Sequence, residues 1–238
     1  PEKRKDGSWI KKIVFNFPLP FCNRKEDALL RKSSPYYKKA EETRTDQLIA
    51  YLKKNTDIRI VYPKEEMLKY KKEYSLYWHY DTHWNAAGGY IGAKALLKEL
   101  GDELPEVENI TFTPDTFSGY DLARMMNLQS YYEKNMPVEE NYIVTGYNGN
   151  NLQAVSIDDA TALVYHSDAP DTRKLFMVRD SFAGGMAGPV ASSLSDCYMA
   201  HWNGFFTQSM VEEQKPDVFV LELVERRLDY LLSFCLTD

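Results

Sequence analysis

The 238-residue sequence is poor in residues on which several classes of small protein depend. Its three cysteines, Cys22, Cys197 and Cys235, are too few and too widely spaced for a disulfide-stapled scaffold or a zinc ribbon. At most one disulfide can form among them, and the apolar surroundings of Cys197 favour a buried, unreactive thiol. No apolar run approaches the roughly 20 residues that a membrane-spanning helix needs.

The sequence also lacks a large excess of either sign of charge. The formal net charge is −6, and the Lys/Arg pairs are scattered, so the sequence gives no indication of a nucleic-acid-binding surface. With 44% apolar and 27% charged residues, the chain can bury a sizeable core. The sequence begins at Pro1 without a signal segment. We expect it to be an excised part of a longer protein, from which a signal peptide or membrane anchor would have been removed.

Strand and helix patterns alternate along much of the chain, which is typical of an α/β protein. Apolar runs predict strands at residues 13–17, 58–62, 161–166, 175–178, 197–201 and 218–223. Amphipathic or capped segments predict helices at residues 35–55, 64–74, 85–100, 120–126, 207–213 and 226–234. Asn85 suits an N-cap and Gly101 a C-terminal stop. Strands separated by helices imply right-handed crossovers, so we expect a three-layer α/β sandwich with a mainly parallel central sheet.

Residues 102–171 depart from this alternation. They are less periodic and rich in Asn, Thr, Tyr and Pro. We interpret them as an insertion or lid within a single domain that spans residues 1–238. The continuous apolar run at 218–223 predicts a fully buried central strand of that domain.

Two short motifs contain the side chains best suited to catalysis. Ser181 follows the strand at 175–178, and ligands bind at the carboxyl ends of the strands in an open parallel sheet. His83 stands two residues after Asp81, in a turn before a helix, where the carboxylate can fix the imidazole tautomer. A serine needs a base to remove its proton, and histidine suits that task near neutral pH. The motifs therefore predict a Ser181–His83–Asp81 triad, although each motif alone is also compatible with a capped helix start.

A metal site is the alternative interpretation of the first motif. On an extended strand, the spacing His79-x-Asp81-x-His83 would place three ligands on one side. No second cluster of His or Cys supplies further ligands, and the aromatic residues nearby favour a loop. We therefore predict no metal.

The two motifs together resemble the alginate O-acetyltransferase proteins of the AlgX and AlgJ type, also called DHHW proteins, which carry a variant SGNH-hydrolase domain. The resemblance rests on segments in the family's order that span about two thirds of the chain: residues 81–85 with Gly88, 119–123, 176–182, and 215–218 leading to 222–226. It implies an SGNH-hydrolase-like fold in which the acid and base precede the nucleophile, a permuted motif order relative to ordinary SGNH enzymes.

The resemblance also implies an extracytoplasmic location, a polysaccharide acceptor, and a membrane-bound O-acyltransferase as the partner that supplies acetyl groups. No cofactor is implied beyond the acetyl donor. We therefore predict a polysaccharide O-acetyltransferase that works through an acyl-serine. The alternatives are a carbohydrate acetylesterase of the SGNH type and an inactive polysaccharide-binding assembly subunit.

Three further residues are candidates for substrate contacts. Arg179 stands where ordinary SGNH hydrolases have the glycine of Gly-Asp-Ser, and it either binds the acetyl donor or a uronate or forms a surface ion pair. The Ser181 amide is the first expected oxyanion donor, and Asn203 with Gly204 fits a second by position, though a plain turn is equally compatible. Trp84 flanks the triad, where it either stacks on a sugar or fills the core.

Overall fold

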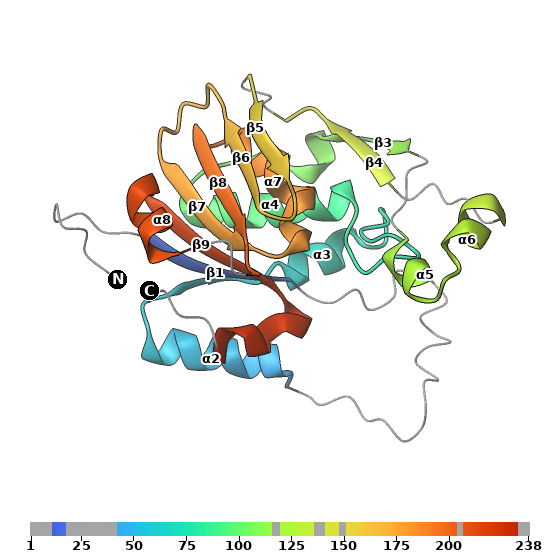
Figure 1. The fold of residues 1–238 in the computed structure, drawn as a ribbon, viewed down its shortest axis with the longest axis horizontal. Coiled ribbons are helices and arrows are strands. Elements are labelled where there is room, and N and C mark those ends of the chain that lie inside the picture. The colour runs from blue at the N-terminus through green and yellow to red at the C-terminus, as the bar shows by residue number, and fades with distance from the viewer. Residues whose placement is uncertain are drawn as a thin grey trace.

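The computed structural model describes residues 11–17, 42–115, 120–135, 141–147, 151–203 and 207–232. A central sheet with helices against it dominates this part of the chain (Figure 1). None of the helices described is both long enough and apolar enough to cross a membrane.

The central sheet is mixed. In their order across it, the described strands are β2 (Arg59–Val61), β1 (Lys11–Phe17), β9 (Val218–Val224), β7 (Lys174–Arg179), β8 (Asp196–His201), β6 (Ala162–His166) and β5 (Gln153–Asp158). The strands from β2 to β8 pair in parallel, whereas β6 and β5 join antiparallel at one edge. The α/β prediction is confirmed, and β9 is buried along its whole length as expected.

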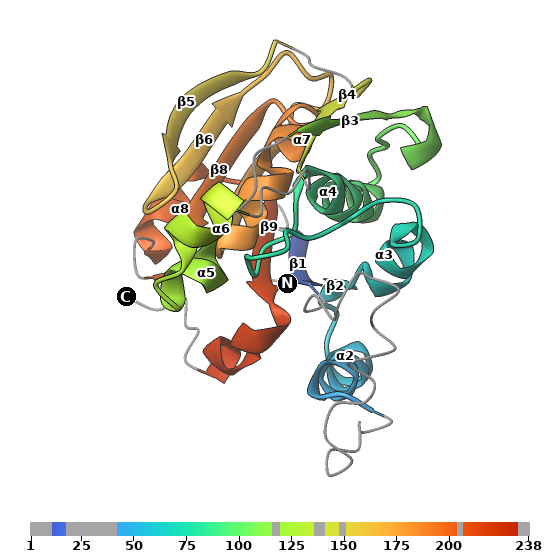
Figure 2. The same cartoon turned by 90° about the vertical axis from the view of Figure 1, so that its right-hand side faces the viewer.

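Side-chain alternation along the strands creates one apolar core on each face of the sheet. Leu175 and Met177 of β7 join the larger core, which also contains side chains of α4 (Ala86–Leu100) and α7 (Ala187–Ala191). Phe176 and Val178 face the smaller core with α8 (Gln208–Gln214). Figure 2 shows α4 and α7 on one side of the sheet and α8 on the other, which gives three layers.

The helix α4 begins and ends where the sequence predicts. The Asn85 side chain accepts hydrogen bonds from the amides of Ala87 and Gly88 at 3.0 and 3.1 Å. The helix stops at Gly101, whose φ of 87° lies in the left-handed region that glycine tolerates. This N-cap fixes the turn that immediately precedes it, and that turn contains Asp81 and His83.

Other helices differ from the prediction mainly at their boundaries. The helix predicted at residues 35–55 is α2 (Arg44–Asn55), and residues 35–41 of the predicted span lie outside the described part. It is followed by α3 (Lys64–Tyr70). The segment after Asp180 starts as a 3₁₀ helix, η2 (Ser181–Met186), before α7 continues it, and the last predicted helix is the 3₁₀ helix η3 (Glu225–Leu232).

The segment predicted as an insertion or lid contributes strands to the central sheet and also forms a separate strand pair. Its strands β5 and β6 extend the central sheet. After the short 3₁₀ helix η1 (Val107–Asn109), β3 (Thr111–Asp115) and β4 (Asn141–Thr145) form a separate antiparallel pair whose side chains pack beside α4, and between them lie α5 (Asp121–Met125) and α6 (Gln129–Asn135). The helix predicted at 120–126 is thereby confirmed. Whether the segment is an insertion stays a prediction.

Close contact between α4 and η2 holds the two sequence motifs together. A Cβ atom at Gly89 would lie 2.1 Å from the carbonyl oxygen of Gly185, and one at Gly185 would lie 2.5 Å from Nε1 of Trp84. The backbone of η2 can approach α4 this closely only because residue 89 is glycine, and the Trp84 indole can lie against residue 185 only because that residue is also glycine.

We expect Gly89→Ala to destabilise the fold, because its methyl group meets a main-chain oxygen that cannot rotate away. Overpacking of this kind costs about 1–3 kcal/mol, and each kcal/mol lowers the Tm of a domain this size by roughly 2–4 °C. Gly188→Ala is the matched control, because its Cβ would meet only the Tyr147 hydroxyl at 3.5 Å. Equal Tm values for the two variants in thermal unfolding would contradict the close-contact argument.

Candidate functional site

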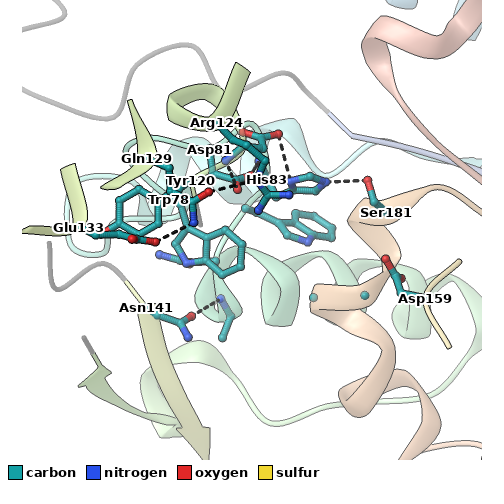
Figure 3. Close-up of a pocket in the computed structure, with 16 residues that line it drawn as sticks. Trp78, Asp81, His83, Tyr120, Arg124, Gln129, Glu133, Asn141, Asp159 and Ser181 are labelled. Atoms are coloured by element: carbon teal, nitrogen blue, oxygen red, sulfur yellow. Dashed lines mark hydrogen bonds and ion pairs between the residues drawn. The ribbon is translucent and has the colours of Figure 1, made fainter. Parts of the chain in front are cut away.

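The structure brings together Ser181, His83 and Asp81. Nε2 of His83 lies 2.6 Å from Oγ of Ser181, and Nδ1 lies 2.6 Å from Oδ1 of Asp81 (Figure 3). Both distances are those of short hydrogen bonds, and the geometry fits an imidazole that donates to the carboxylate and accepts from the hydroxyl. The predicted juxtaposition of residues 98 positions apart is therefore present in the fold.

Two separate parts of the fold position the triad. Ser181 is the first residue of η2, beyond the carboxyl end of β7. His83 lies in the turn before α4, where its carbonyl oxygen accepts from the Trp78 amide at 3.2 Å. The indole N–H of Trp84 donates to the carbonyl of Phe182 at 2.8 Å, which ties this turn directly to the residue after the serine. The imidazole consequently lies beside the Phe182 ring, with centroids 4.7 Å apart.

Asp81 is held in a form suited to orienting the imidazole. Burial would raise the pKa of its carboxyl group. Hydrogen bonds from the His83 ring, the His83 amide and the Asp121 amide outweigh that effect and keep the pKa of Asp81 below its ordinary value. Asp81 is thus an ionised acceptor at neutral pH.

Asp121 is a site residue to which the sequence argument gave no role. Its carboxylate accepts from the amide and hydroxyl of Thr82 at 2.7 and 2.5 Å, and its own amide donates to Asp81 at 3.0 Å. These bonds attach α5 to the turn that carries His83. The segment 119–123 belongs to the family resemblance, and that was the available indication of its importance.

A cavity of about 910 Å³ opens in front of the triad. Its wall combines aromatic and polar side chains from the turn before α4, from α5 and α6, and from β4. Besides the triad, the lining residues are Trp78, Trp84, Asn85, Ala86, Tyr120, Asp121, Arg124, Gln129, Glu133, Asn141, Asp159, Gly184 and Gly185. A site of this size and mixed polarity suits an organic ligand.

One wall of the cavity is an organised polar row. Nε of Arg124 donates to Gln129 at 3.3 Å, and the Gln129 amide donates to Glu133 at 2.7 Å. Tyr120 lies beside this row, and its ring stacks on that of Tyr80 with centroids 6.0 Å apart. The row and the aromatic ring offer both hydrogen-bonding groups and a flat face to a ligand (Figure 3).

Arg179 does not lie where its predicted substrate contact requires. The side chain is 0% exposed and is not a cavity-lining residue. Its guanidinium donates to the carboxylate and carbonyl of Asp159 at 2.6 and 2.9 Å. The ion-pair alternative therefore describes Arg179, with the difference that the arginine is buried and only Asp159, at 62% exposure, reaches the surface.

Asn203 and Trp84 also differ from their predicted roles. Asn203 is exposed in the turn after β8 and is not among the described residues that line the cavity, and Gly204 lies outside the described part. Trp84 is 2% exposed and bonded to Phe182, so it supports the wall from behind rather than presenting a stacking face. Between the two readings of Trp84, the core interpretation is correct.

The structure does not bring together the three residues that the alternative metal site requires. Within the described residues, the ligand-type atoms that lie within 4.8 Å of one another belong to Asp81, His83 and Asp121, without His79. The ring of His79 instead contacts that of Tyr80, with centroids 5.4 Å apart. Both nitrogens of His83 are already engaged by Asp81 and Ser181.

No protein-family model matches the chain. No curated protein matches it either. Solved structures do share its fold. A DHHW family protein from Eubacterium siraeum superposes with a TM-score of 0.63 at 13% identity, over 94% of this chain and 81% of that chain.

Two further structures are similar. PatB1 of Bacillus cereus, solved with a sulfonyl adduct, has a TM-score of 0.59 at 12% identity, over 92% of this chain and 83% of that chain. The O-acetyltransferase domain of Pseudomonas putida AlgJ has a TM-score of 0.50 at 15% identity, over 95% and 80%. These proteins belong to one structural family, and the resemblance drawn from the sequence motifs is confirmed at the level of the fold.

We expect the purified protein to contain far less than one equivalent of zinc, because both His83 nitrogens already have hydrogen-bond partners. Elemental analysis after dialysis, before and after treatment with a chelator, measures this directly. Stoichiometric zinc that disappears in His83→Ala but not in Ser181→Ala would establish a metal site in place of the triad.

Proposed function

We propose that this protein is an O-acetyltransferase that transfers acetyl groups to hydroxyl groups of an extracellular polysaccharide through an acyl-enzyme at Ser181. The observation that carries the proposal is the hydrogen-bonded series Asp81–His83–Ser181 facing a cavity of about 910 Å³. A serine with a base at 2.6 Å, and a carboxylate behind that base, is the arrangement that activates a hydroxyl for covalent catalysis.

In the first step, Oγ of Ser181 forms a bond to the acetyl carbonyl carbon while His83 takes the hydroxyl proton. The bond between the acetyl group and the donor's leaving group then breaks, and the imidazolium returns its proton to that leaving group. Asp81 stabilises the positive imidazolium between these events. In the second step, His83 takes a proton from a sugar hydroxyl and the sugar oxygen forms a bond to the acetyl carbon. The bond between that carbon and Oγ of Ser181 then breaks, and the imidazolium returns its proton to Oγ.

The oxyanion formed in both steps needs donors. The Ser181 amide remains the predicted first donor. A donor of this kind contributes about 3–4 kcal/mol in known acyl-transfer sites. The exposed position of Asn203 does not support it as the second oxyanion donor.

The acceptor region follows from the lining of the cavity. The Trp78 and Tyr120 rings offer flat faces that suit a sugar ring, and the row from Arg124 to Glu133 offers hydrogen-bonding partners to its hydroxyls. The shared fold with the AlgJ O-acetyltransferase domain and with PatB1 supports the reaction class. The permuted motif order, the extracytoplasmic location and a membrane-bound O-acyltransferase that supplies acetyl groups belong to the same proposal, which requires no cofactor.

Acetyl hydrolysis is the second candidate activity. His83 is partly exposed in an open cavity, so water can reach the acyl-serine in place of a sugar hydroxyl. The balance between transfer and hydrolysis depends on how well the acceptor excludes water.

We expect Ser181→Ala to reduce acetyl-ester turnover to the background rate, because no covalent intermediate can form. His83→Ala and Asp81→Ala should each lose several orders of magnitude, roughly 10³- to 10⁶-fold in kcat. Turnover of a chromogenic acetyl ester, with mass spectrometry of an acetylated oligosaccharide product, measures both outcomes.

The matched control for these triad variants is His79→Ala, which removes a nearby histidine that does not line the cavity. It should retain activity. Unchanged activity in Ser181→Ala would refute the covalent mechanism. A folded wild-type protein that binds polysaccharide but shows neither transfer nor hydrolysis would favour the binding-subunit alternative.

We expect Trp78→Ala to weaken acceptor binding and leave acylation intact. Loss of an aromatic face costs about 0.5–1.5 kcal/mol, which corresponds to a roughly two- to twelvefold higher KM for the oligosaccharide. Trp202→Ala serves as control, because Trp202 packs against Tyr230 and does not line the cavity. Equal acceptor KM values in the two variants would remove Trp78 from the acceptor region.

A further inference from the structure

Glu222 is an ionisable residue in an unusual place. It lies in β9, in the middle of the sheet, among residues that are otherwise apolar, and its side chain is 0% exposed. Burying a carboxyl group in such surroundings is costly unless its hydrogen-bonding capacity is used. None of the catalytic steps proposed above employs it.

The hydrogen bonds of Glu222 lie at the point where the pairing of β7 with β9 ends. The last paired residues are Val178 and Leu221. Beyond them, Oε2 of Glu222 accepts from the Asp180 amide at 2.8 Å. The Asp180 carboxylate in turn accepts from the Val224 amide at 2.8 Å. Two side chains thus continue the connection between the strands after the main-chain pairing has stopped.

The Asp180 carboxylate also binds the main chain just after Ser181. Oδ1 of Asp180 accepts from the Phe182 amide at 2.9 Å and caps the first turn of η2. The amide groups of the residues immediately before and after Ser181 are therefore both held by buried carboxyl groups.

We propose that Asp180 and Glu222 form a two-carboxyl clamp that fixes the main chain on both sides of Ser181, and that Glu222 is a positioning residue for the reaction. This inference rests on the proposed acyl transfer at Ser181. A misplacement of about 1 Å at a reacting group costs on the order of 10²-fold in rate, so a device that fixes the serine backbone has a measurable consequence.

The clamp requires that its two carboxyl groups are not both charged. Burial, and then the negative charge of Asp180, raise the pKa of Glu222 well above its ordinary value. Arg179 opposes this shift, but its guanidinium is committed to Asp159. Oε1 of Glu222 has no hydrogen-bond partner among the described residues, which further disfavours a charge there. The protonated, neutral form of Glu222 is accordingly favoured, beside an Asp180 that accepts two amide hydrogen bonds.

The kinetic test compares Glu222→Gln with Glu222→Leu. Glutamine is neutral and keeps an oxygen that accepts from the Asp180 amide, whereas leucine fills similar space without an acceptor. We expect Glu222→Leu to slow modification of Ser181 by a sulfonyl fluoride, and acetyl-ester kcat, by about 30- to 100-fold with the acceptor KM unchanged. Glu222→Gln should stay within about threefold of wild type.

Val220→Ala is the control for general destabilisation, because Val220 is a buried residue of the same strand whose side chain has no hydrogen-bonding group and packs in the larger apolar core. It should lower the Tm and leave the labelling rate unchanged at a temperature where all variants are folded. A folded Glu222→Leu that labels at the wild-type rate would overturn the positioning role, and so would a Glu222→Gln as slow as Glu222→Leu.

The pH dependence of stability gives a readout that a purely steric role would not move. Above pH 4.5, Glu222 ionises in the unfolded chain but stays protonated in the fold, so the wild type loses stability as the pH rises towards the folded pKa. Glutamine does not titrate. The Tm of Glu222→Gln relative to wild type should therefore increase from pH 5 to pH 8, and a constant difference would contradict a neutral Glu222.

The two proposals fail in different ways. A wild-type protein that is folded but is neither labelled at Ser181 nor active would overturn the acyl-transfer function, and with it the positioning role. A wild type that is labelled and active, with an equally reactive Glu222→Leu, would overturn the positioning role alone.

Discussion

The site depends on the close attachment of the turn before α4 to the first residues of η2. The indole of Trp84 donates to the Phe182 carbonyl, Gly89 lets the backbone of η2 approach α4, and Gly185 leaves room for the indole. Because this contact sets the distance between the two motifs, it also sets the 2.6 Å separation of His83 and Ser181. A tryptophan that resembles a ligand-stacking residue in the sequence instead connects the turn that carries His83 to the segment that carries Ser181.

Hydrogen bonds of buried polar groups fix positions that the apolar core alone does not define. An apolar core tolerates small shifts of a strand end, whereas a hydrogen bond from a buried amide to a carboxyl group defines a position within a few tenths of an ångström. Asp121 does this for the His83 turn through Thr82 and Asp81. On the serine side, Asp180 and Glu222 do the same at the end of β7. Each half of the triad is thus supported by a residue from a distant part of the chain, Asp121 on one side and Glu222 on the other.

Much of the fold was predictable because its information is local. The Asn85 cap, the Gly101 stop and the apolar run of β9 depend on neighbouring residues, and all are found as predicted. The roles of Arg179 and Asn203 could not be predicted in this way, because they depend on the direction in which a side chain points at the end of a strand. Arg179 turns into the protein because Asp159, 20 residues away in the sequence, offers a partner there. Nothing in the spacing of the sequence indicates that pairing.

The sequence by itself determined most of the helices and strands and indicated that Ser181, His83 and Asp81 belong together, because helix caps, strand alternation and suitable residue types can all be recognised within short segments. The tertiary structure alone decided which polar residues face the cavity and which are buried supports. That choice follows from contacts between β7, β9, α5 and the turn before α4, which are distant in sequence. It made Arg179 and Trp84 structural, and it revealed Asp121 and Glu222 as the residues that hold the triad in place.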